Sequence, residues 1–189
     1  NSNHHTPFKD SIYGSNLCVA PETLVLTKEG EFPIHTLQNK EVEVWNGEQW
    51  SKTVVRKTGE NQNLLKVTIS KGKEKISIEC TPYHKFYTQL GVYEAKDLKL
   101  GMNLESWFTP EGDQVLSFVY EVEDLGRKDD TFCFTEPLRN RGTFNGIVTG
   151  NCNEVYLSTK PFNSVLELYK TEYEEGDGYV QTCNLCAIN

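Results

Sequence analysis

Short runs of alternating apolar and polar residues fill the chain between residues 18 and 150, and this pattern predicts β-strands. Alternation places one face of a strand against a core and the other face in solvent. Such runs occupy residues 23–27, 41–45, 64–69, 75–80, 115–122 and 144–149. Many short strands at close spacing favour a compact all-β domain. Within this region, residues 95–101 fit either a helical turn or a loop.

Turn sequences between these runs predict two hairpins. Asn46-Gly47 comes directly after the strand 41–45, and both residues tolerate the positive φ angles of a type I′ turn. A Lys-Gly-Lys turn follows the strand 64–69 in the same way. The sequence therefore predicts two antiparallel hairpins, and residues 144–149 form a single last strand.

The pattern changes on both sides of this body. Residues 1–17 are polar and rich in turn-forming residues, which predicts an extended arm. Residues 152–189 contain an approximate helical stripe at 162–173 and a strand-like run at 179–186. This tail is too short to bury a core of its own, and it looks like the beginning of a different domain. We therefore divide the chain into a flank of residues 1–17, a central domain of residues 18–151 and a second flank of residues 152–189.

Composition narrows the class of protein. The chain has 189 residues, of which 37% are hydrophobic and 24% charged, as expected for one soluble domain with tails. The net charge of −8 gives no support to nucleic-acid binding. The sequence holds neither a signal peptide nor an apolar run long enough to span a membrane. We therefore expect a cytoplasmic monomer that binds neither nucleic acid nor membrane, with its six cysteines as thiols.

The two ends of the central domain carry residues that can break and remake peptide bonds. The Cys18 thiol can attack the carbonyl of Leu17 and convert the amide to a thioester, and Cys152 can then take over the acyl group. The side-chain amide of Asn151 can attack its own carbonyl, close a succinimide and release the Asn151–Cys152 bond. The acyl group then shifts from sulfur to nitrogen, which restores a peptide bond. Covalent transfers divide one difficult cleavage into easier steps, and proximity of the two ends supplies about 7–11 kcal/mol in a well-aligned case.

Each of these residues alone has an ordinary explanation. A lone cysteine is usually a small buried hydrophobic residue, and Asn-Cys occurs by chance. The flanks, however, form a continuous sequence when the central domain is removed, because Leu17 would then precede Cys152. The combination predicts single-turnover protein splicing, in which the central domain excises itself and its own flanks are the substrate.

Four sequence blocks in the central domain resemble those of inteins. They begin at Cys18-Val-Ala-Pro-Glu-Thr and end at Asn151-Cys152, and between them lie residues 78–86, with a Thr-x-x-His motif, and residues 131–137. The resemblance implies an all-β, horseshoe-shaped Hint fold in which the two splice junctions meet at the centre. Too few residues lie between 98 and 131 for a nuclease domain, so the resemblance is to a mini-intein.

The resemblance also implies roles for three residues near the Leu17–Cys18 bond. Thr81 would contribute a hydrogen bond to the scissile group. His84, with a pKa near the ordinary 6.5, would donate a proton to the departing amide nitrogen. Cys133 stands where this block commonly has an aspartate, so it would either assist acyl transfer as a thiol or thiolate or simply pack in the core.

The carboxy-terminal junction departs from the intein pattern at two positions. Inteins often carry histidines that assist asparagine cyclisation, but this chain has Gly150 before Asn151 and Asn140 at the earlier position. Asn140 or a neighbouring arginine would then polarise the carbonyl, as oxyanion-type donors do. We therefore expect cyclisation to be the slow step.

The flanks resemble the large chain of ribonucleotide reductase, in the Ser-Asn-Leu sequence that ends at Leu17 and in the sequence from Cys183 to Asn189. In that family the cysteine after Ser-Asn-Leu belongs to the active-site thiol pair, so Cys152 would serve there after splicing. Cys183 and Cys186 lack the second pair that a structural zinc site needs. We expect no cofactor, no metal and no nucleotide reduction by this fragment.

Two other interpretations stay open. A Hint-type autoprocessing domain that only cleaves, like those of hedgehog proteins, would share Cys18, Thr81 and His84 but would not need Asn151 and Cys152. A non-catalytic β module inserted in a reductase fragment would leave the chain whole. Incubation of the purified chain distinguishes these from splicing, because only splicing both cuts and rejoins.

Overall fold

The computed structural model describes residues 17–151 of the chain. The predictions made for the arm at 1–16, the helix at 162–173, the strand at 179–186 and the thiol of Cys152 lie outside the described residues. In the described part no helix is long and apolar enough to cross a membrane.

The described residues form an all-β domain, as predicted, and two short 3₁₀ turns. The elements are β1 (Leu24–Thr27), β2 (Gly30–Pro33), η1 (Ile34–Leu37), β3 (Glu41–Trp45), β4 (Trp50–Lys71), β5 (Glu74–Cys80), β6 (Lys85–Thr88), β7 (Gly91–Glu94), η2 (Ala95–Asp97), β8 (Trp107–Phe108), β9 (Gln114–Val115), β10 (Phe118–Phe134), β11 (Arg141–Phe144) and β12 (Ile147–Gly150). The 3₁₀ turn η2 settles the alternative left open for residues 95–101 in favour of a helical turn.

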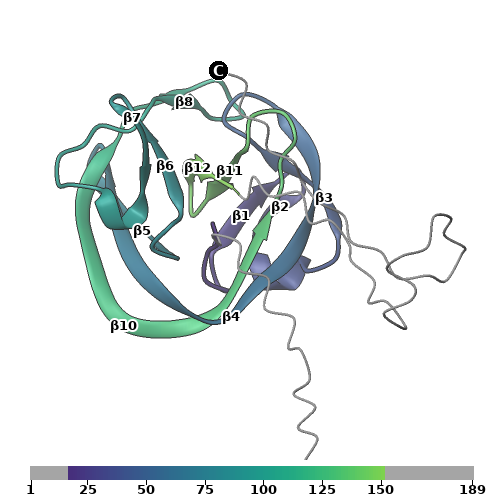
Figure 1. The fold of residues 1–189 in the computed structure, drawn as a ribbon. Helices are drawn as coiled ribbons and strands as arrows, with labels where there is room; N and C mark the ends of the chain where they lie inside the picture. Colours follow the sequence, from purple (N-terminus) through teal and green to yellow (C-terminus); the bar gives the residue numbers. More distant parts are fainter. Residues whose placement is uncertain (1–16, 152–189) are drawn as a thin grey trace, which may run out of the picture. The chain divides into compact units, whose positions relative to one another are not determined.

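One eight-stranded antiparallel sheet organises the domain (Figure 1). Its strand order is β10-β4-β3-β1-β11-β12, and β2 and β5 add to it by pairing with β1 and β4. Two further hairpins, β6–β7 and β8–β9, are separate two-stranded sheets. This order places β1, near the start of the described chain, beside β11, near its end.

The strands β4 and β10 are far longer than the sequence pattern predicts. They contain 22 and 17 residues and run side by side as one long curved ribbon (Figure 1). The predicted strand 64–69 is only part of β4, and the predicted strand 115–122 is interrupted after Val115, where β9 ends. Four register shifts along the β4–β10 pair are β-bulges or irregularities, and bulges bend a strand and increase its twist. The polar middle of β4 is a strand because β10 pairs with it, which no local pattern reveals.

The hairpin turns confirm one prediction and correct another. Gly72, with φ of 61°, lies in the tight turn between β4 and β5, as predicted. The β3–β4 hairpin also forms, but its turn is a four-residue loop rather than a type I′ Asn-Gly turn, because Trp45 pairs with Trp50. Asn46 instead accepts hydrogen bonds from the backbone of Glu48 and Gln49 through its side-chain oxygen, a local arrangement typical of asparagine in turns.

The predicted last strand 144–149 is in fact a hairpin. β11 and β12 are joined at Asn145-Gly146, whose φ angles of 49° and 77° fit the positive-φ turn that Asn-Gly favours. The Asn145 side chain accepts a hydrogen bond from the backbone of Leu24 at 2.7 Å and donates one to the carbonyl of Ser77 at 2.8 Å. These bonds fix the carboxy-terminal hairpin to both β1 and β5.

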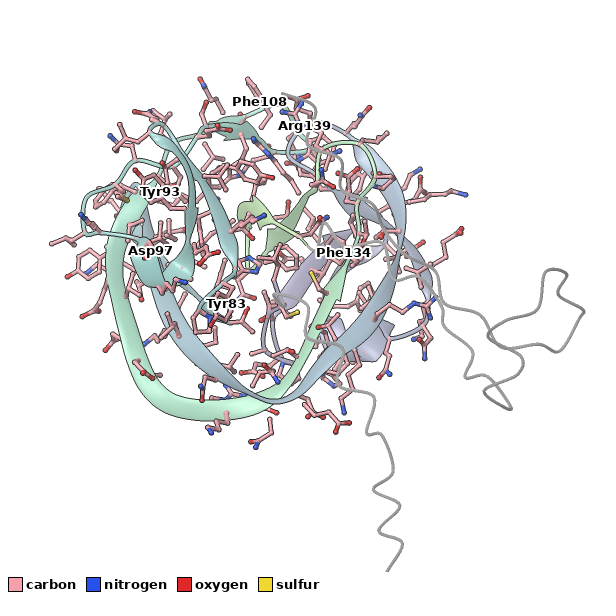
Figure 2. The ribbon with its side chains drawn as sticks, viewed as in Figure 1. Tyr83, Tyr93, Asp97, Phe108, Phe134 and Arg139 are labelled. Atoms are coloured by element: carbon pink, nitrogen blue, oxygen red, sulfur yellow. The ribbon has the colours of Figure 1, made fainter. Side chains whose placement is uncertain are left out.

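The core lies where this hairpin meets the long strands. The rings of Phe134 and Phe144 stack with centroids 5.2 Å apart, and Phe134 points into the interior (Figure 2). A Cβ atom on Gly142 would collide with the Phe134 ring. Only glycine therefore permits this close approach, which holds β11 against the end of β10.

Candidate functional site

The first described residues are buried between β5 and β10. Leu17, Cys18 and Val19 are all nearly or fully excluded from solvent. Val19 exchanges two backbone hydrogen bonds of 3.0 Å with Phe132 of β10, and the Cys18 carbonyl accepts one of 2.9 Å from the amide of Thr81. The Leu17–Cys18 bond is therefore held on both sides by strands that come from the middle and the end of the central segment.

A β-turn brings Thr81 and His84 to this bond. The His84 amide donates to the Thr81 carbonyl at 3.0 Å, and Pro82 occupies the second position of the turn, where its fixed φ is favourable. The Thr81 hydroxyl lies 3.2 Å from the amide nitrogen of Cys18 and accepts its hydrogen bond. The spacing of the Thr-x-x-His motif is thus the spacing of one turn.

The His84 ring is buried between the two ends of the described chain. Its Nε2 is 2.8 Å from the hydroxyl of Thr149 in β12, and the rings of Phe86 and Phe144 meet it edge to face. Nδ1 has no hydrogen-bond partner among the described residues, although the backbone of Leu17 lies close enough to favour the protonated ring. A backbone group with that effect is a carbonyl oxygen, because it accepts from the ring.

Burial changes the protonation expected for His84. It lowers the pKa of the imidazole to about 4, and the Leu17 backbone offsets this only in part. The sequence-based expectation of a donor with a pKa near 6.5 is therefore wrong: at neutral pH the ring is neutral. A neutral imidazole still offers one N–H donor and one nitrogen acceptor.

Two residues contact the Cys18 side chain from the long strands. Cys133 in β10 packs against it, and its own thiol donates weakly to the Phe134 carbonyl at 3.5 Å. The Thr58 hydroxyl in β4 lies 2.7 Å from the Cys18 sulfur and 3.1 Å from the carbonyl of Thr131. Thr58 was not predicted from the sequence, because it lies in the polar stretch of β4 that carries no strand pattern.

The described cysteines match the predicted thiol state. Cys18, Cys80 and Cys133 are all buried, and none is joined by a disulfide to another described cysteine. Burial, with smaller contributions from Cys18 and Glu79, raises the pKa of the Cys80 thiol far above its usual range. Cys80 is therefore a protonated core residue rather than a nucleophile.

Asn151 is held by backbone carbonyls at the end of β12. Its side-chain Nδ2 donates to the carbonyl of Arg141 at 3.3 Å, and its backbone amide donates to the carbonyl of Asn140 at 3.1 Å. Asn140 has a φ of 55°, which turns the chain back toward β11. Asn140 thus offers Asn151 an acceptor through its backbone, and the role of its side chain as a donor stays a prediction.

The neighbouring arginines are engaged by carboxylates. Arg139 pairs with Glu48, and Arg141 pairs with Glu105 at 2.7 Å and lies over the ring of Tyr87 at 3.8 Å. Among the described contacts neither guanidinium is directed at Asn151. The expectation that an arginine polarises the Asn151 carbonyl therefore finds no support in this arrangement.

A buried carboxylate shapes the loop that holds Asn151. Glu136 is fully buried, and its oxygens accept hydrogen bonds from the backbone of Leu138 at 3.0 Å, from the backbone of Arg139 at 2.8 Å and from the side chain of Asn46 at 3.2 Å. Burial by itself would raise the pKa of Glu136, but these bonds and the Ser51 hydroxyl favour the charged form and lower it. One local signal could have identified this residue, namely a carboxylate followed by proline at the end of an apolar run.

Steric crowding explains why the residue before Asn151 is a glycine. A Cβ atom on Gly150 would lie 2.9 Å from both the Cβ atom and the carbonyl oxygen of Lys85. Real Cβ atoms essentially never come so close to backbone. The histidine that inteins often carry at this position is therefore excluded here by β6.

The predicted residues form one continuous arrangement. Cys18, Thr81, His84 and Cys133 lie together around the Leu17–Cys18 bond, and His84 connects them through Thr149 to β12, the strand that leads to Asn151. Such an arrangement can act on both ends of the central segment. Thr58, Glu136 and Thr149 complete it, and periodicity did not identify them.

Comparison with solved structures shows the same chain trace in three inteins. A DnaB intein from Synechocystis sp. PCC 6803 matches with a TM-score of 0.61 and 15% identity, over 71% of this chain and 98% of that one. The gp41-1 intein matches with a TM-score of 0.55 and 22% identity, over 71% and 98%. The DnaX mini intein from Spirulina platensis matches with a TM-score of 0.56 and 20% identity, over 71% and 99%. Almost the whole length of each of these structures is matched.

Sequence comparison gives a different kind of relative. No family model matches the chain. The ribonucleoside-diphosphate reductase large subunit of Invertebrate iridescent virus 6 is 46% identical over 93 residues, which is 49% of this chain and 9% of that protein. The chain thus spans about a tenth of the length of this relative. Residues 1–17 and 152–189 are together fewer than 93, so the aligned part must include some of the central segment 18–151.

The TM-scores and the matched length of these structures support one assignment of fold. The described part of the chain has the Hint fold of the mini-inteins.

Proposed function

We propose that residues 18–151 splice themselves out of the chain and join residues 1–17 to residues 152–189. The observation that carries this proposal is the link from one junction to the other. The Thr81 hydroxyl binds the amide nitrogen of Cys18, and His84 reaches from that bond to Thr149, two residues before Asn151. The host would be a ribonucleotide reductase large chain, in keeping with the identity of the viral relative.

The first step is attack of the Cys18 sulfur on the Leu17 carbonyl carbon. A carbon–sulfur bond forms, the peptide carbon–nitrogen bond breaks, and the thiol proton ends on the released amino group. Thr81 holds the amide nitrogen through its N–H, which fixes the orientation of the bond to be broken. The neutral His84 ring carries one N–H and lies between the Thr149 hydroxyl and the Leu17 backbone, so it would supply that proton to the departing Cys18 nitrogen.

In the second step the Cys152 sulfur attacks the thioester carbon, a new carbon–sulfur bond forms, and the Cys18 sulfur leaves as a thiolate. Cys133 is in contact with Cys18, so its thiol is placed to exchange a proton with the leaving sulfur. Removing Cys133 tests this role against simple packing, because a serine would keep a proton donor whereas an alanine would not.

The third step is cyclisation of Asn151. Its Nδ2 attacks its own backbone carbonyl carbon, the bond to the Cys152 nitrogen breaks, and that nitrogen leaves with a proton. The Arg141 carbonyl accepts from Nδ2, which draws the N–H proton away and makes the nitrogen more nucleophilic. Backbone acceptors would thus take over part of the work that histidines do in other inteins.

Cleavage without ligation is the second candidate. The buried, doubly hydrogen-bonded Asn151 favours splicing, because a domain that only cleaves at Cys18 has no need of an ordered asparagine at its other end. Mass spectrometry of the incubated chain distinguishes the two. Splicing releases residues 18–151 with a carboxy-terminal succinimide or asparagine, together with one peptide in which Leu17 is bonded to Cys152.

The matched control is the double variant Cys18→Ala, Asn151→Ala, which should stay whole. A parent chain that also stays whole, with Cys18 and Asn151 unmodified, would contradict the proposal. A chain that releases residues 1–17 without ligation would favour the cleavage-only function.

A further inference from the structure

Thr58 stands at an irregular point of the long β4–β10 pair. Gly59 is opposite Thr131, and Lys57 is opposite Phe132. Thr58 between them has no opposite residue, so it is the extra residue of a β-bulge. Bulges near active sites commonly re-aim a side chain. Here the side chain aimed by the bulge ends 2.7 Å from the sulfur of Cys18.

The surroundings of this contact limit what can act on the thiol. Cys18 is fully buried, so bulk water does not solvate its sulfur. The Thr58 hydroxyl has one proton and two acceptors within reach, the Cys18 sulfur at 2.7 Å and the Thr131 carbonyl at 3.1 Å. A hydroxyl can accept from one group while it donates to another, and can rotate to exchange these partners.

We propose that Thr58 is a catalytic residue of the first step, which stabilises the Cys18 sulfur as its proton leaves. This role rests on the proposed splicing function. With the thiol intact, the Thr58 hydroxyl shares its one proton between the Cys18 sulfur and the Thr131 carbonyl. When the sulfur is deprotonated, the hydroxyl turns fully to the sulfur and gives up the Thr131 carbonyl.

The proton balance of the step is complete without a further reactant. The thiol proton leaves the Cys18 sulfur and ends on the Cys18 nitrogen, as the sulfur–carbon bond to Leu17 forms and the carbon–nitrogen bond breaks. Thr58 stays neutral throughout and only changes its hydrogen-bond partner. Hydrogen bonds to charged groups are stronger than those to neutral groups, so the contact favours the reactive form of the nucleophile.

The test isolates the first step. In a chain carrying Asn151→Ala and Cys152→Ala, only the Leu17–Cys18 junction can react, and added dithiothreitol releases residues 1–17 from the thioester. Thr58→Val should slow this release about ten- to a hundredfold, which is the loss of one hydrogen bond to a charged group. It should also move the pH profile of release toward higher pH, while Thr58→Ser should restore the rate to within a few-fold.

Thr68→Val is the matched control, because it removes a hydroxyl from the same strand, where Thr68 contacts Ser77 rather than Cys18. It should release residues 1–17 at the parent rate. A second measurement separates catalysis from folding: cleavage after Asn151 in a Cys18→Ala chain, with and without Thr58→Val. Equal slowing at both junctions would show that Thr58 only supports the fold.

The role is overturned if Thr58→Val releases residues 1–17 at the parent rate with an unshifted pH profile, or if serine fails to rescue. Failure of the parent chain to react at either junction has a different meaning. That result would overturn the proposed splicing function, and the role of Thr58 with it.

Discussion

The ring of His84 and the hydroxyl of Thr149 are 2.8 Å apart, and this hydrogen bond joins the turn beside one junction to the strand that leads to the other. Both residues are fully buried. His84 follows Thr81, which binds the Cys18 amide, and Thr149 precedes Gly150 and Asn151. The imidazole of His84 therefore contacts residues near both junctions, and a change at either one can alter its position or its hydrogen bonds.

The first prediction concerns this bond. Thr149→Val should slow the release of residues 1–17 about tenfold, because the ring loses the partner that fixes its orientation and its N–H position. Release by dithiothreitol in the Asn151→Ala, Cys152→Ala chain measures the effect. Thr149→Ser keeps the hydroxyl and should react close to the parent rate. If valine and serine behave alike, the bond has no part in the first step.

The second prediction concerns pH and folding. The folded pKa of His84, about 4, lies below its ordinary value of 6.5, so between these values the unfolded chain binds more protons than the folded chain. Stability should therefore be lost as the pH falls from about 6.5 to about 4, by a total on the order of 3 kcal/mol from this residue. Above about 6.5 both forms are neutral and the contribution is constant.

Urea unfolding of the non-reacting Cys18→Ala, Asn151→Ala chain, with and without His84→Gln, measures this contribution. Carboxylates with lowered pKa values, such as Glu136, also lose stabilising charge in acid, but they are common to both chains. The difference between the two chains should shrink as the pH falls. A difference that is the same at neutral and acidic pH would contradict the assigned pKa.

The third prediction concerns Glu136. Glu136→Gln keeps the shape but replaces one charged acceptor oxygen with an N–H₂ group, which cannot accept from the backbone of Leu138 or Arg139. Cleavage after Asn151 in the Cys18→Ala chain should slow about tenfold, because the loop that positions the Arg141 carbonyl loses its organiser. Release of residues 1–17 should change much less.

The control is Glu48→Gln. It removes the exposed carboxylate that pairs with Arg139, a residue of the loop that Glu136 organises. Exposed ion pairs contribute little, so this variant should cleave at nearly the parent rate. Equal effects of Glu48→Gln and Glu136→Gln would show that the buried carboxylate has no special part in holding Asn151.

The fourth prediction concerns the missing histidine. Gly150→His restores the residue common in inteins, yet it should slow cleavage after Asn151 and lower the thermal unfolding temperature. The new Cβ would collide with the backbone of Lys85, and overpacking of this kind costs about 1–3 kcal/mol. Asn140→His is the comparison, because histidine tolerates positive φ better than most residues and Asn140 is half-buried. It should leave the unfolding temperature almost unchanged. Faster cleavage by Gly150→His would contradict the steric explanation.

The candidate site residues could be predicted from the sequence more completely than the strands that carry them. The Thr-x-x-His motif and the residues at the two junctions are local in sequence, so a single chain reveals them. The full lengths of β4 and β10 are not local, because their polar middle parts become strands only by pairing with each other. Thr58 could not be predicted for the same reason, because its β-bulge exists only through the pairing of β4 with β10.

The preference of Asn-Gly for a tight positive-φ turn holds in this protein, but at a different Asn-Gly from the one predicted. The sequence contains Asn-Gly twice, and the tight positive-φ turn forms at Asn145-Gly146 rather than at Asn46-Gly47. The side chain of Asn46 instead donates a hydrogen bond to the buried Glu136, and its loop has four residues. Long-range contacts thus decided between two identical dipeptides.

The long-range contacts that hold Cys18 also decide when the site around it can assemble. Thr81 is 63 positions from Cys18, and Phe132, which pairs with Val19, comes still later. Contacts so distant in sequence form late in folding, and domains fold as units during synthesis. A nascent chain therefore lacks the Val19–Phe132 pairing beside the Leu17–Cys18 bond until β10 has been made. Under the proposed splicing function, the first step would therefore wait until most of the central domain has been made, because the strands that hold the Leu17–Cys18 bond come after it in the chain.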